Sequence, residues 1–356
     1  MAAILIGSAI TAIPGGWLAD KSIRWSILCF QVLVAVALIL FSRVATLESA
    51  LVACFAVGVG MGGVLPAMTK AVINWFPIRE RATAMGLFFS GASIGSAASA
   101  AILPSLSLGM GWRQAFLFLA IVITVIGIGS AALYGDNREV ARPGPAKAPR
   151  ARPEDGKTRS TFWNVARLGL VAILLGGPQY ALATYLLLYL NQSLLFSVVQ
   201  AGLLLSVAQG CGLIGRIGSG ILSDRLFKGD RRLIFLAMGA VFTACLSLIA
   251  VGVSQEATFL VLMVVTGLSG FGWFSIWMTW LAEISASGSA ATVGFGQTCA
   301  YVGVVIGPPL FGYVVDSTNS YLSAWIGCSV IAGIGTLLIL SVREPSRAGH
   351  GGMTGT

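Results

Sequence analysis

Long apolar runs alternate with short polar loops along almost the whole chain. A helix needs about 20 consecutive apolar residues to cross the hydrocarbon core of a bilayer. Eleven runs meet this requirement, so the pattern predicts an all-α integral membrane protein with eleven transmembrane helices. The runs cover residues 2–18, 26–43, 51–73, 82–104, 113–134, 164–189, 200–222, 233–253, 258–282, 291–315 and 321–342.

One polar segment, residues 135–163, is much longer than the other loops. It contains four prolines and seven Lys or Arg residues, a composition that predicts a largely structureless linker. The linker separates an N-terminal bundle of five helices (residues 1–134) from a C-terminal bundle of six (residues 164–343), and residues 344–356 form a tail.

Basic residues lie almost entirely on one side of the predicted helices. Lys and Arg are concentrated in cytoplasmic loops of membrane proteins. We therefore expect the linker and the tail to be cytoplasmic, in a multi-pass protein of a bacterial inner membrane. On the opposite side, only Arg43 and Arg113 lie near helix ends.

A short charged loop occurs twice, each time between two apolar runs. The first copy contains Gly16, Asp20, Lys21 and Arg24, and the second contains Gly220, Asp224 and Arg225. Glycine lets two helices meet closely at a tight bend. A carboxylate is costly in hydrocarbon, so each Asp should lie at the membrane face.

The repeated loop resembles the loop between the second and third helices of major facilitator superfamily (MFS) transporters, and its repeat between the eighth and ninth. The first copy departs from the family pattern at Ile23, where a glycine is usual. Glycines nine residues apart also recur in both halves, as Gly86 with Gly95 and Gly294 with Gly303. The resemblance implies two parallel-repeat bundles that rock about a central site. With five helices in the first bundle, we expect the family's first helix to be absent.

In this family, such an Asp braces the cytoplasmic gate against the start of a helix in the other half. For Asp20, the resemblance implies the helix that begins near residues 289–292. Glu283 lies at the cytoplasmic end of its helix, and we expect it to pair with Arg225 or Arg232. The alternative is that these charged residues only set the topology.

Composition excludes several other classes of protein. Only 10% of residues are charged and 56% are hydrophobic, unlike a soluble domain. The net charge of +9 lies in short loops rather than on one face, which argues against nucleic-acid binding. All six cysteines lie in apolar runs without a C-x-x-C pair, and the one histidine, His350, lies in the tail. We expect no enzyme activity, no metal site and no cofactor.

Arg216 is the main candidate for substrate binding. A charged residue deep in a membrane helix costs about 2.5–3.5 kcal/mol on insertion scales, so it should face a cavity. Helical spacing places it on one polar and small stripe with Ser206, Gln209 and Gly212. Its guanidinium suits a carboxylate, because it can donate two parallel hydrogen bonds. The alternative is that Arg216 reaches the cytoplasmic surface or pairs with Glu283.

Further candidates lie in other apolar runs. The sequence Gly176-Gly177-Pro178 predicts a break in the helix 164–189, which would free backbone carbonyls to line a cavity. Trp273 and Trp277 share a helix face, and either line the cavity or pack in the core. The remaining candidates are Gln179, Tyr180, Tyr185, Gln297 and Tyr301.

The resemblance and Arg216 together predict a secondary transporter, a symporter or antiporter, for a small organic anion such as a carboxylate. The alternatives are efflux of amphipathic drug-like compounds, and a non-transporting sensor or inactive fragment. The expected partners are a small-molecule substrate and the lipid bilayer, with a coupling proton as a further candidate. We expect a monomer that binds no nucleic acid.

Overall fold

The structure is a computed structural model that describes residues 2–134, 155–227, 229–252, 255–284 and 289–342. Every regular element in these ranges is a helix. They are α1 (Ala2–Lys21), α2 (Ile23–Ser42), α3 (Leu47–Trp75), α4 (Arg81–Met110), α5 (Trp112–Leu133), α6 (Asp155–Gln192), α7 (Val198–Ile221), α8 (Arg231–Val251), α9 (Glu256–Thr266), α10 (Trp273–Ile284), α11 (Ala290–Thr318) and α12 (Tyr321–Ile339). Two five-residue π-helical turns, Leu222–Leu226 and Gly267–Phe271, follow α7 and join α9 to α10.

Ten helices in the described part of the chain are long and apolar enough to cross a membrane. One of them joins α9, the second π turn and α10 into a single span, Glu256–Ile284. The helix α4 lies among the others but is not one of the ten. The all-helical membrane fold is therefore confirmed, whereas the predicted count of eleven is not.

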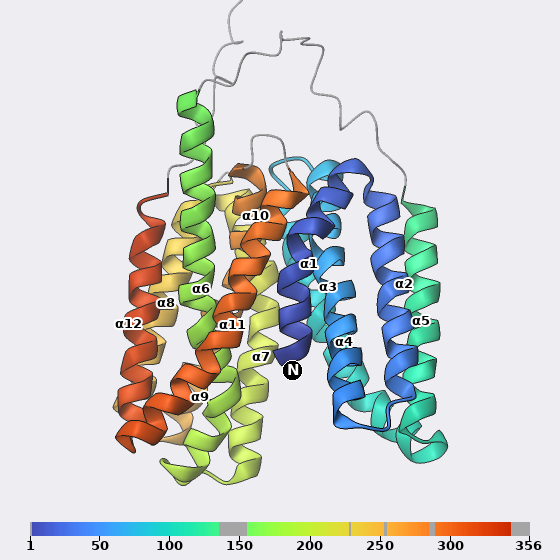
Figure 1. Cartoon of the computed structure of the whole chain (residues 1–356). Helices are drawn as coiled ribbons and strands as arrows, with labels where there is room; N and C mark the ends of the chain where they lie inside the picture. The colour runs from blue at the N-terminus through green and yellow to red at the C-terminus, as the bar shows by residue number, and fades with distance from the viewer. Residues whose placement is uncertain (1, 135–154, 228, 253–254, 285–288, 343–356) are drawn as a thin grey trace, which may run out of the picture.

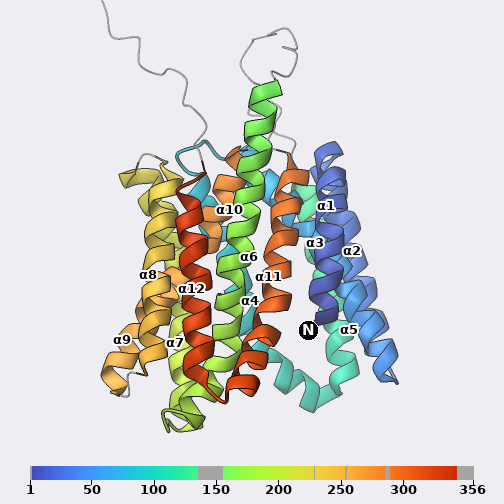
Figure 2. The same cartoon turned by 60° about the vertical axis from the view of Figure 1, so that its left-hand side comes forward.

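The helices form two groups that lie side by side (Figure 1). In the N-terminal group, α3 packs along α1 and α2, and α2 packs along α5. In the C-terminal group, α6 packs along α11 and α12, and α8 packs along α12 (Figure 2). The main contacts between the groups are α1 against α11 and α4 against α7.

The two groups have different interiors. Fully buried aromatic side chains, among them Trp273, Trp277 and Trp325, fill the C-terminal group. The N-terminal group instead brings backbones together at glycines. A Cβ built on Gly58, for example, would lie 2.0 Å from the carbonyl oxygen of Ile4. Small residues at such contacts let membrane helices pack closely.

The predicted break at Gly176-Gly177-Pro178 is wrong, because α6 runs without interruption from Asp155 to Gln192. Gly177 instead provides a close contact with α11. A Cβ built on Gly307 would lie 2.4 Å from the carbonyl oxygen of Gly177. Proline removes one backbone donor, and packing against neighbouring helices compensates for this loss in membranes.

The helix α6 also begins earlier than expected, so residues 155–163 of the predicted linker are helical. The rest of that linker, residues 135–154, and the predicted tail, residues 344–356, lie outside the described residues.

Candidate functional site

Asp20, near the end of α1, contacts the first residues of α11. Its carboxylate accepts hydrogen bonds from the Ser289 hydroxyl (2.6 Å) and from the backbone N–H groups of Ala290 (2.8 Å) and Ala291 (3.3 Å). Lys70 of α3 donates to the same carboxylate at 2.7 Å. Unpaired N–H groups and the helix dipole stabilise a carboxylate at a helix N-terminus. Asp20 therefore joins the two groups at the helix end that the resemblance implied.

Asp224, in the π turn after α7, makes the corresponding contact with α4. The backbone N–H and the hydroxyl of Thr83 both donate to its Oδ2, each at 2.8 Å. Its Oδ1 accepts from Arg231, whose Nη2 also contacts Glu283 Oε1 at 3.0 Å. Arg231 Nη2 further donates to the carbonyl of Ile78 at 2.7 Å. The side chains of Arg231 and Asp224 are only 2% and 1% exposed, so this ion pair is buried.

The predicted partner of Glu283 was therefore wrong: it pairs with Arg231, not with Arg225 or Arg232. Arg231 is the first residue of α8 and points into the protein. Consecutive helical residues point about 100° apart, so Arg232 is turned away and donates to the carbonyl of Leu340. Arg225 is exposed.

Both Asp contacts lie at the same end of the molecule, the upper end in Figure 1, which we call the charged end. Here Gly16 and Gly220 allow the groups to touch. A Cβ built on Gly16 would lie 2.3 Å from the carbonyl oxygen of Ala290, and one on Gly220 would lie 2.5 Å from that of Ala82. Lys21 and Arg24, from the first charged loop, are exposed and take no part in the Asp20 contacts.

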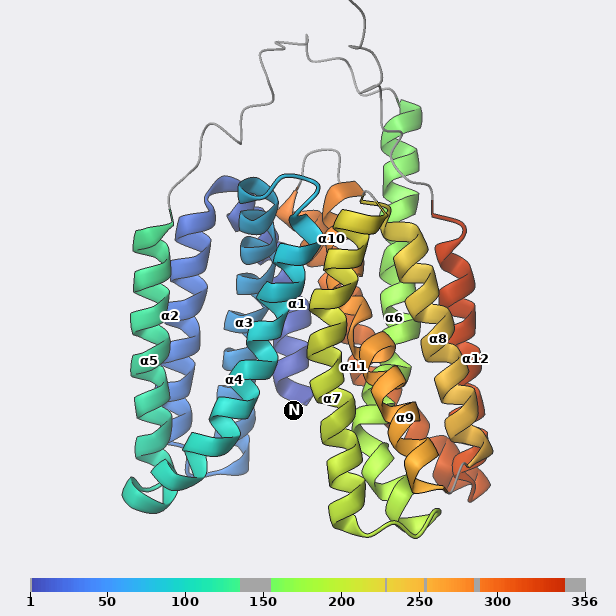
Figure 3. The ribbon, with the colours of Figure 1, turned by 180° about the vertical axis from the view of Figure 1, so that it is seen from behind.

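The helices α4 and α7 touch near the charged end and separate toward the opposite end (Figure 3). A Cβ built on Gly86 would lie 2.3 Å from the carbonyl oxygen of Arg216. Farther along, Gln209 is exposed. In that part of the helices, a Cβ built on Gly91, Gly95 or Gly210 would have no described atom within 4 Å other than those of its own helical turns. The two groups are therefore closed against each other at the charged end, and Arg216 lies where they part.

Arg216 spans the space between the groups. Its Nε donates to the carbonyl of Phe271 at 3.1 Å, within the C-terminal group. Its Nη1 donates to the Ser93 hydroxyl (2.9 Å) and to the carbonyl of Phe89 (3.3 Å), both on α4. Glu283 is engaged by Arg231, and no carboxylate in the described ranges pairs with Arg216. Arg216 therefore holds a positive charge among neutral partners.

Tyr180 lies near this guanidinium, and Tyr301 lies near Tyr180. Tyr180 of α6 interacts electrostatically with both Arg216 and Tyr301. Tyr301 of α11 also interacts with Gln297, one turn away, and with Ser8 of α1. Gln297 is only 3% exposed, and its Oε1 has no hydrogen-bond partner among the described residues. The structure thus brings Tyr180 close to Arg216, and it brings Tyr301, with its neighbour Gln297, close to Tyr180.

The other aromatic and amide candidates belong to the interior of the C-terminal group. Trp273 and Trp277 are 1% and 0% exposed, so they pack in the core rather than line a cavity. The indole N–H of Trp273 donates to Gln179 Oε1 at 3.0 Å, and that of Trp277 to the carbonyl of Leu168 at 2.9 Å. The Tyr185 ring lies against that of Phe311, tilted by 30°, with ring centroids 4.8 Å apart.

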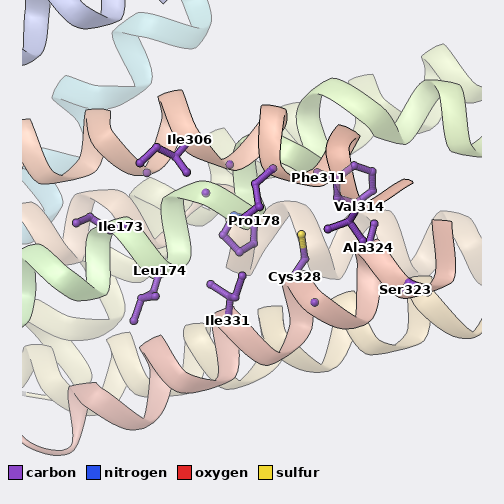
Figure 4. Close-up of a pocket in the computed structure, with 15 residues that line it drawn as sticks. Ile173, Leu174, Pro178, Ile306, Phe311, Val314, Ser323, Ala324, Cys328 and Ile331 are labelled. Atoms are coloured by element: carbon purple, nitrogen blue, oxygen red, sulfur yellow. The ribbon is translucent and has the colours of Figure 1, made fainter. Parts of the chain in front are cut away.

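An apolar hollow of about 280 Å³ lies between α6, α11 and α12 (Figure 4). Its wall includes Pro178, Phe311 and Cys328, and Ser323 supplies its one hydroxyl. Ile306 and Leu310, at its edge, are 53% and 46% exposed. No charged side chain lines it, so it offers nothing that could recognise a charged solute.

Sequence comparison agrees with this geometry. The family model described as Major Facilitator Superfamily matches residues 1–294. The chain belongs to the Major Facilitator Superfamily, and it is a transporter rather than an enzyme. The probable sulfoacetate transporter SauU of Cupriavidus necator is 27% identical over 94% of this chain and 82% of its own. The probable L-galactonate transporter of Escherichia coli is 26% identical over 81% of this chain and 68% of its own.

Solved MFS structures share the fold. The crystal structure of the Escherichia coli fucose:proton symporter FucP superposes with a TM-score of 0.74, covering 96% of this chain and 90% of its own. At 16% identity, this likeness shows the fold alone.

Sequence reasoning missed several residues of these contacts, among them Lys70, Thr83, Ser93, Arg231 and Ile78. Thr83 and Ser93 are ordinary helical hydroxyl residues without a distinguishing pattern. Ile78 contributes only its backbone carbonyl. The one available signal was the position of Arg231 directly after Asp230, which caps α8 by accepting from Leu233 N–H at 3.0 Å. The cap fixes where α8 begins, but it does not indicate which of the two adjacent arginines faces inward.

Proposed function

We propose that this protein carries a small organic anion, such as a carboxylate, across the membrane by alternating access. The observation that carries the proposal is Arg216, a half-buried cation at the point where the two groups part. The relatives named above support the class of substrate, because sulfoacetate and galactonate are both small organic anions.

Arg216 and Tyr180 provide the donors for such an anion. Arg216 Nη2 and the Tyr180 hydroxyl have no hydrogen-bond partner among the described residues. A guanidinium and a phenol can together hold one carboxylate through charge-assisted bonds. Gln297 Oε1, buried and without a described partner, would accept a hydrogen bond from a hydroxyl group elsewhere on the substrate.

Binding at Arg216 would be coupled to movement of the groups. Ser93 and Phe89 belong to α4, whereas Arg216 belongs to α7, so the guanidinium is held from both sides. A substrate carboxylate would compete for the guanidinium protons and so weaken the hold of α7 on α4. A ligand shifts an equilibrium between two states only through such a difference in contacts.

The charged end is proposed to face the cytoplasm of a bacterial cell, since basic loops concentrate there. The closed charged end then makes this an outward-facing state of a monomer. Symport with a proton and antiport both fit this arrangement.

The test is uptake into proteoliposomes that contain the purified full chain. Radiolabelled sulfoacetate and galactonate are the probes. We expect Arg216→Lys and Arg216→Gln to lower the transport kcat/KM by about 10- to 100-fold, the value of a hydrogen bond to a charged group. Arg43→Gln, an exposed change at the other end, is the control.

The outcomes separate the alternatives. If both Arg216 variants transport an anion as well as the unchanged protein, Arg216 does not bind the substrate. If no organic anion is taken up by well-folded protein, a sensor becomes the better interpretation. Efflux of amphipathic drugs lost its main support when Trp273 and Trp277 proved to be core residues.

A further inference from the structure

A second hollow, of about 330 Å³, lies between α2 and α5 at the charged end, away from the interface of the two groups. Side chains from both helices form its apolar wall, and the one charged residue among them is Arg24. The lining residues are Arg24, Trp25 and Leu28 of α2, and Ile128, Ala131 and Ala132 of α5.

The shape of the hollow follows from the size of its side chains. One turn deeper, α2 and α5 are in direct contact, since a Cβ built on Gly127 would lie 2.7 Å from the Gln31 Cβ. Toward the charged end, the small side chains of Ala131 and Ala132 face the larger Leu28 and Trp25. The mismatch leaves a space with an apolar wall.

Arg24 is a cation without a described partner at this site. It belongs to the first charged loop, but Asp20 is paired with Lys70 instead. Arg24 is exposed and makes no hydrogen bond or ion pair within the described part of the chain. The resemblance therefore does not explain what Arg24 binds.

Exposed aromatic side chains lie at the same end of the molecule as this hollow. Trp25 is 61% exposed beside the hollow. Trp75, 46% exposed, lies against Tyr134 at the end of α5, with ring centroids 6.4 Å apart. Exposed Trp and Tyr side chains gather where the bilayer meets water, because one end of each is apolar and the other polar.

We propose that this hollow binds one anionic phospholipid, with its phosphate on Arg24 and an acyl chain along Leu28, Ile128 and Ala132. Guanidinium binds phosphate through two parallel hydrogen bonds. The wall is apolar and opens on the outer surface of two membrane-spanning helices, where lipid is the surrounding medium. A soluble phosphate would leave the apolar wall uncovered. The cation at Arg24 and the apolar wall together therefore favour a lipid.

The test is native mass spectrometry of the full chain in detergent, titrated with phosphatidylglycerol. We expect one phosphatidylglycerol to bind more tightly than phosphatidylcholine. Arg24→Gln should weaken that binding by about five-fold, the factor that one cation is worth near an anionic surface. Ala132→Leu should weaken it without any change of charge, because leucine fills the hollow. Ala132 is exposed, so the larger side chain meets no core.

Arg43→Gln removes the same charge from the other end of α2 and is the matched control. Unchanged binding in this variant supports the proposal. Equal weakening by Arg24→Gln and Arg43→Gln would mean diffuse attraction and would overturn it. The proposal also fails if phosphatidylcholine binds as tightly, if inorganic phosphate displaces the lipid at equal concentration, or if Ala132→Leu has no effect. Thermal unfolding without lipid, unchanged in all three variants, excludes loss of folding as the cause.

Discussion

Replacing Asp20 by Asn should shift the protein away from the state that is closed at the charged end. Three of the four hydrogen bonds to this carboxylate come from residues of the other group, namely Ser289, Ala290 and Ala291. Asparagine keeps one acceptor oxygen but loses the charge. Its NH₂ group would also face an N–H donor of α11.

The size of the shift follows from the contacts. A carboxylate at a helix N-terminus contributes about 0.3–1 kcal/mol when exposed and up to about 2 kcal/mol when partly buried. The Asp20 side chain is 28% exposed, which places it toward the upper part of this range. A loss of about 1–2 kcal/mol changes the ratio of closed to open molecules by roughly 5- to 30-fold.

Double electron–electron resonance measures the distance between two spin labels, and it can therefore report the ratio of closed to open molecules. Lys21 and Leu226 are exposed residues at the charged end, on opposite groups. Labels at these positions, in a chain whose six free cysteines are replaced, report the separation of the groups. We expect a longer distance to become populated in Asp20→Asn.

Lys70→Gln provides the matched control. Lys70 and Asp20 both belong to the N-terminal group, so this change breaks an ion pair and leaves the contacts between the groups intact. The ion pair is only partly exposed, but it lies within one group and does not join the two, so we expect little change in distance. An equal shift in both variants, or none in Asp20→Asn, would refute the reasoning.

Two further predictions follow from close packing and from the core. Gly86→Leu should prevent closure at the charged end, because a Cβ at this position would lie 2.3 Å from the carbonyl oxygen of Arg216. The same spin labels should then show the longer, open distance. Gly91→Leu is the control and should leave the distance unchanged, since a Cβ there has no close neighbour. Trp273→Phe should lower stability by about 2 kcal/mol, since it leaves the buried Gln179 Oε1 without its donor. Thermal unfolding in detergent measures this loss, and Trp17→Phe, at a 61% exposed position, should show none.

The sequence was most informative where one property dominates. Membrane helices follow from length and apolarity, and the repeated Asp follows from the high energy of a carboxylate in hydrocarbon. The helix facing Asp20 was reached only through the resemblance, since no local pattern joins residues 270 positions apart.

The sequence was least informative where only packing distinguishes residues of the same chemical type. Gly176-Gly177-Pro178 has the composition of a helix break, but α11 presents glycines to the same turn, and close contact keeps α6 continuous. Arg231 and Arg232 are chemically identical neighbours, and only the rotation of α8 decides which one meets Glu283. Tryptophans on one helix face fit a cavity and a core equally well until the facing helices are known.

The arrangement of charges at the charged end explains how such a tight closure can still open. Arg231, Asp224 and Glu283 all belong to the C-terminal group, and Asp20 and Lys70 both belong to the N-terminal group. Among the described residues, separation of the groups therefore breaks no ion pair, so none of these buried charges loses its partner, a loss that would be destabilising by about 3–5 kcal/mol. The contacts that break are hydrogen bonds, among them those to Thr83, to Ile78 and to the start of α11, and those from Arg216 to α4. Water can replace each of them, at a net loss of about 1.5–3 kcal/mol for a hydrogen bond to a charged group, less where the group is partly exposed. Keeping the ion pairs within each group is therefore what leaves the closed and open states close enough in free energy for a bound solute to shift the balance.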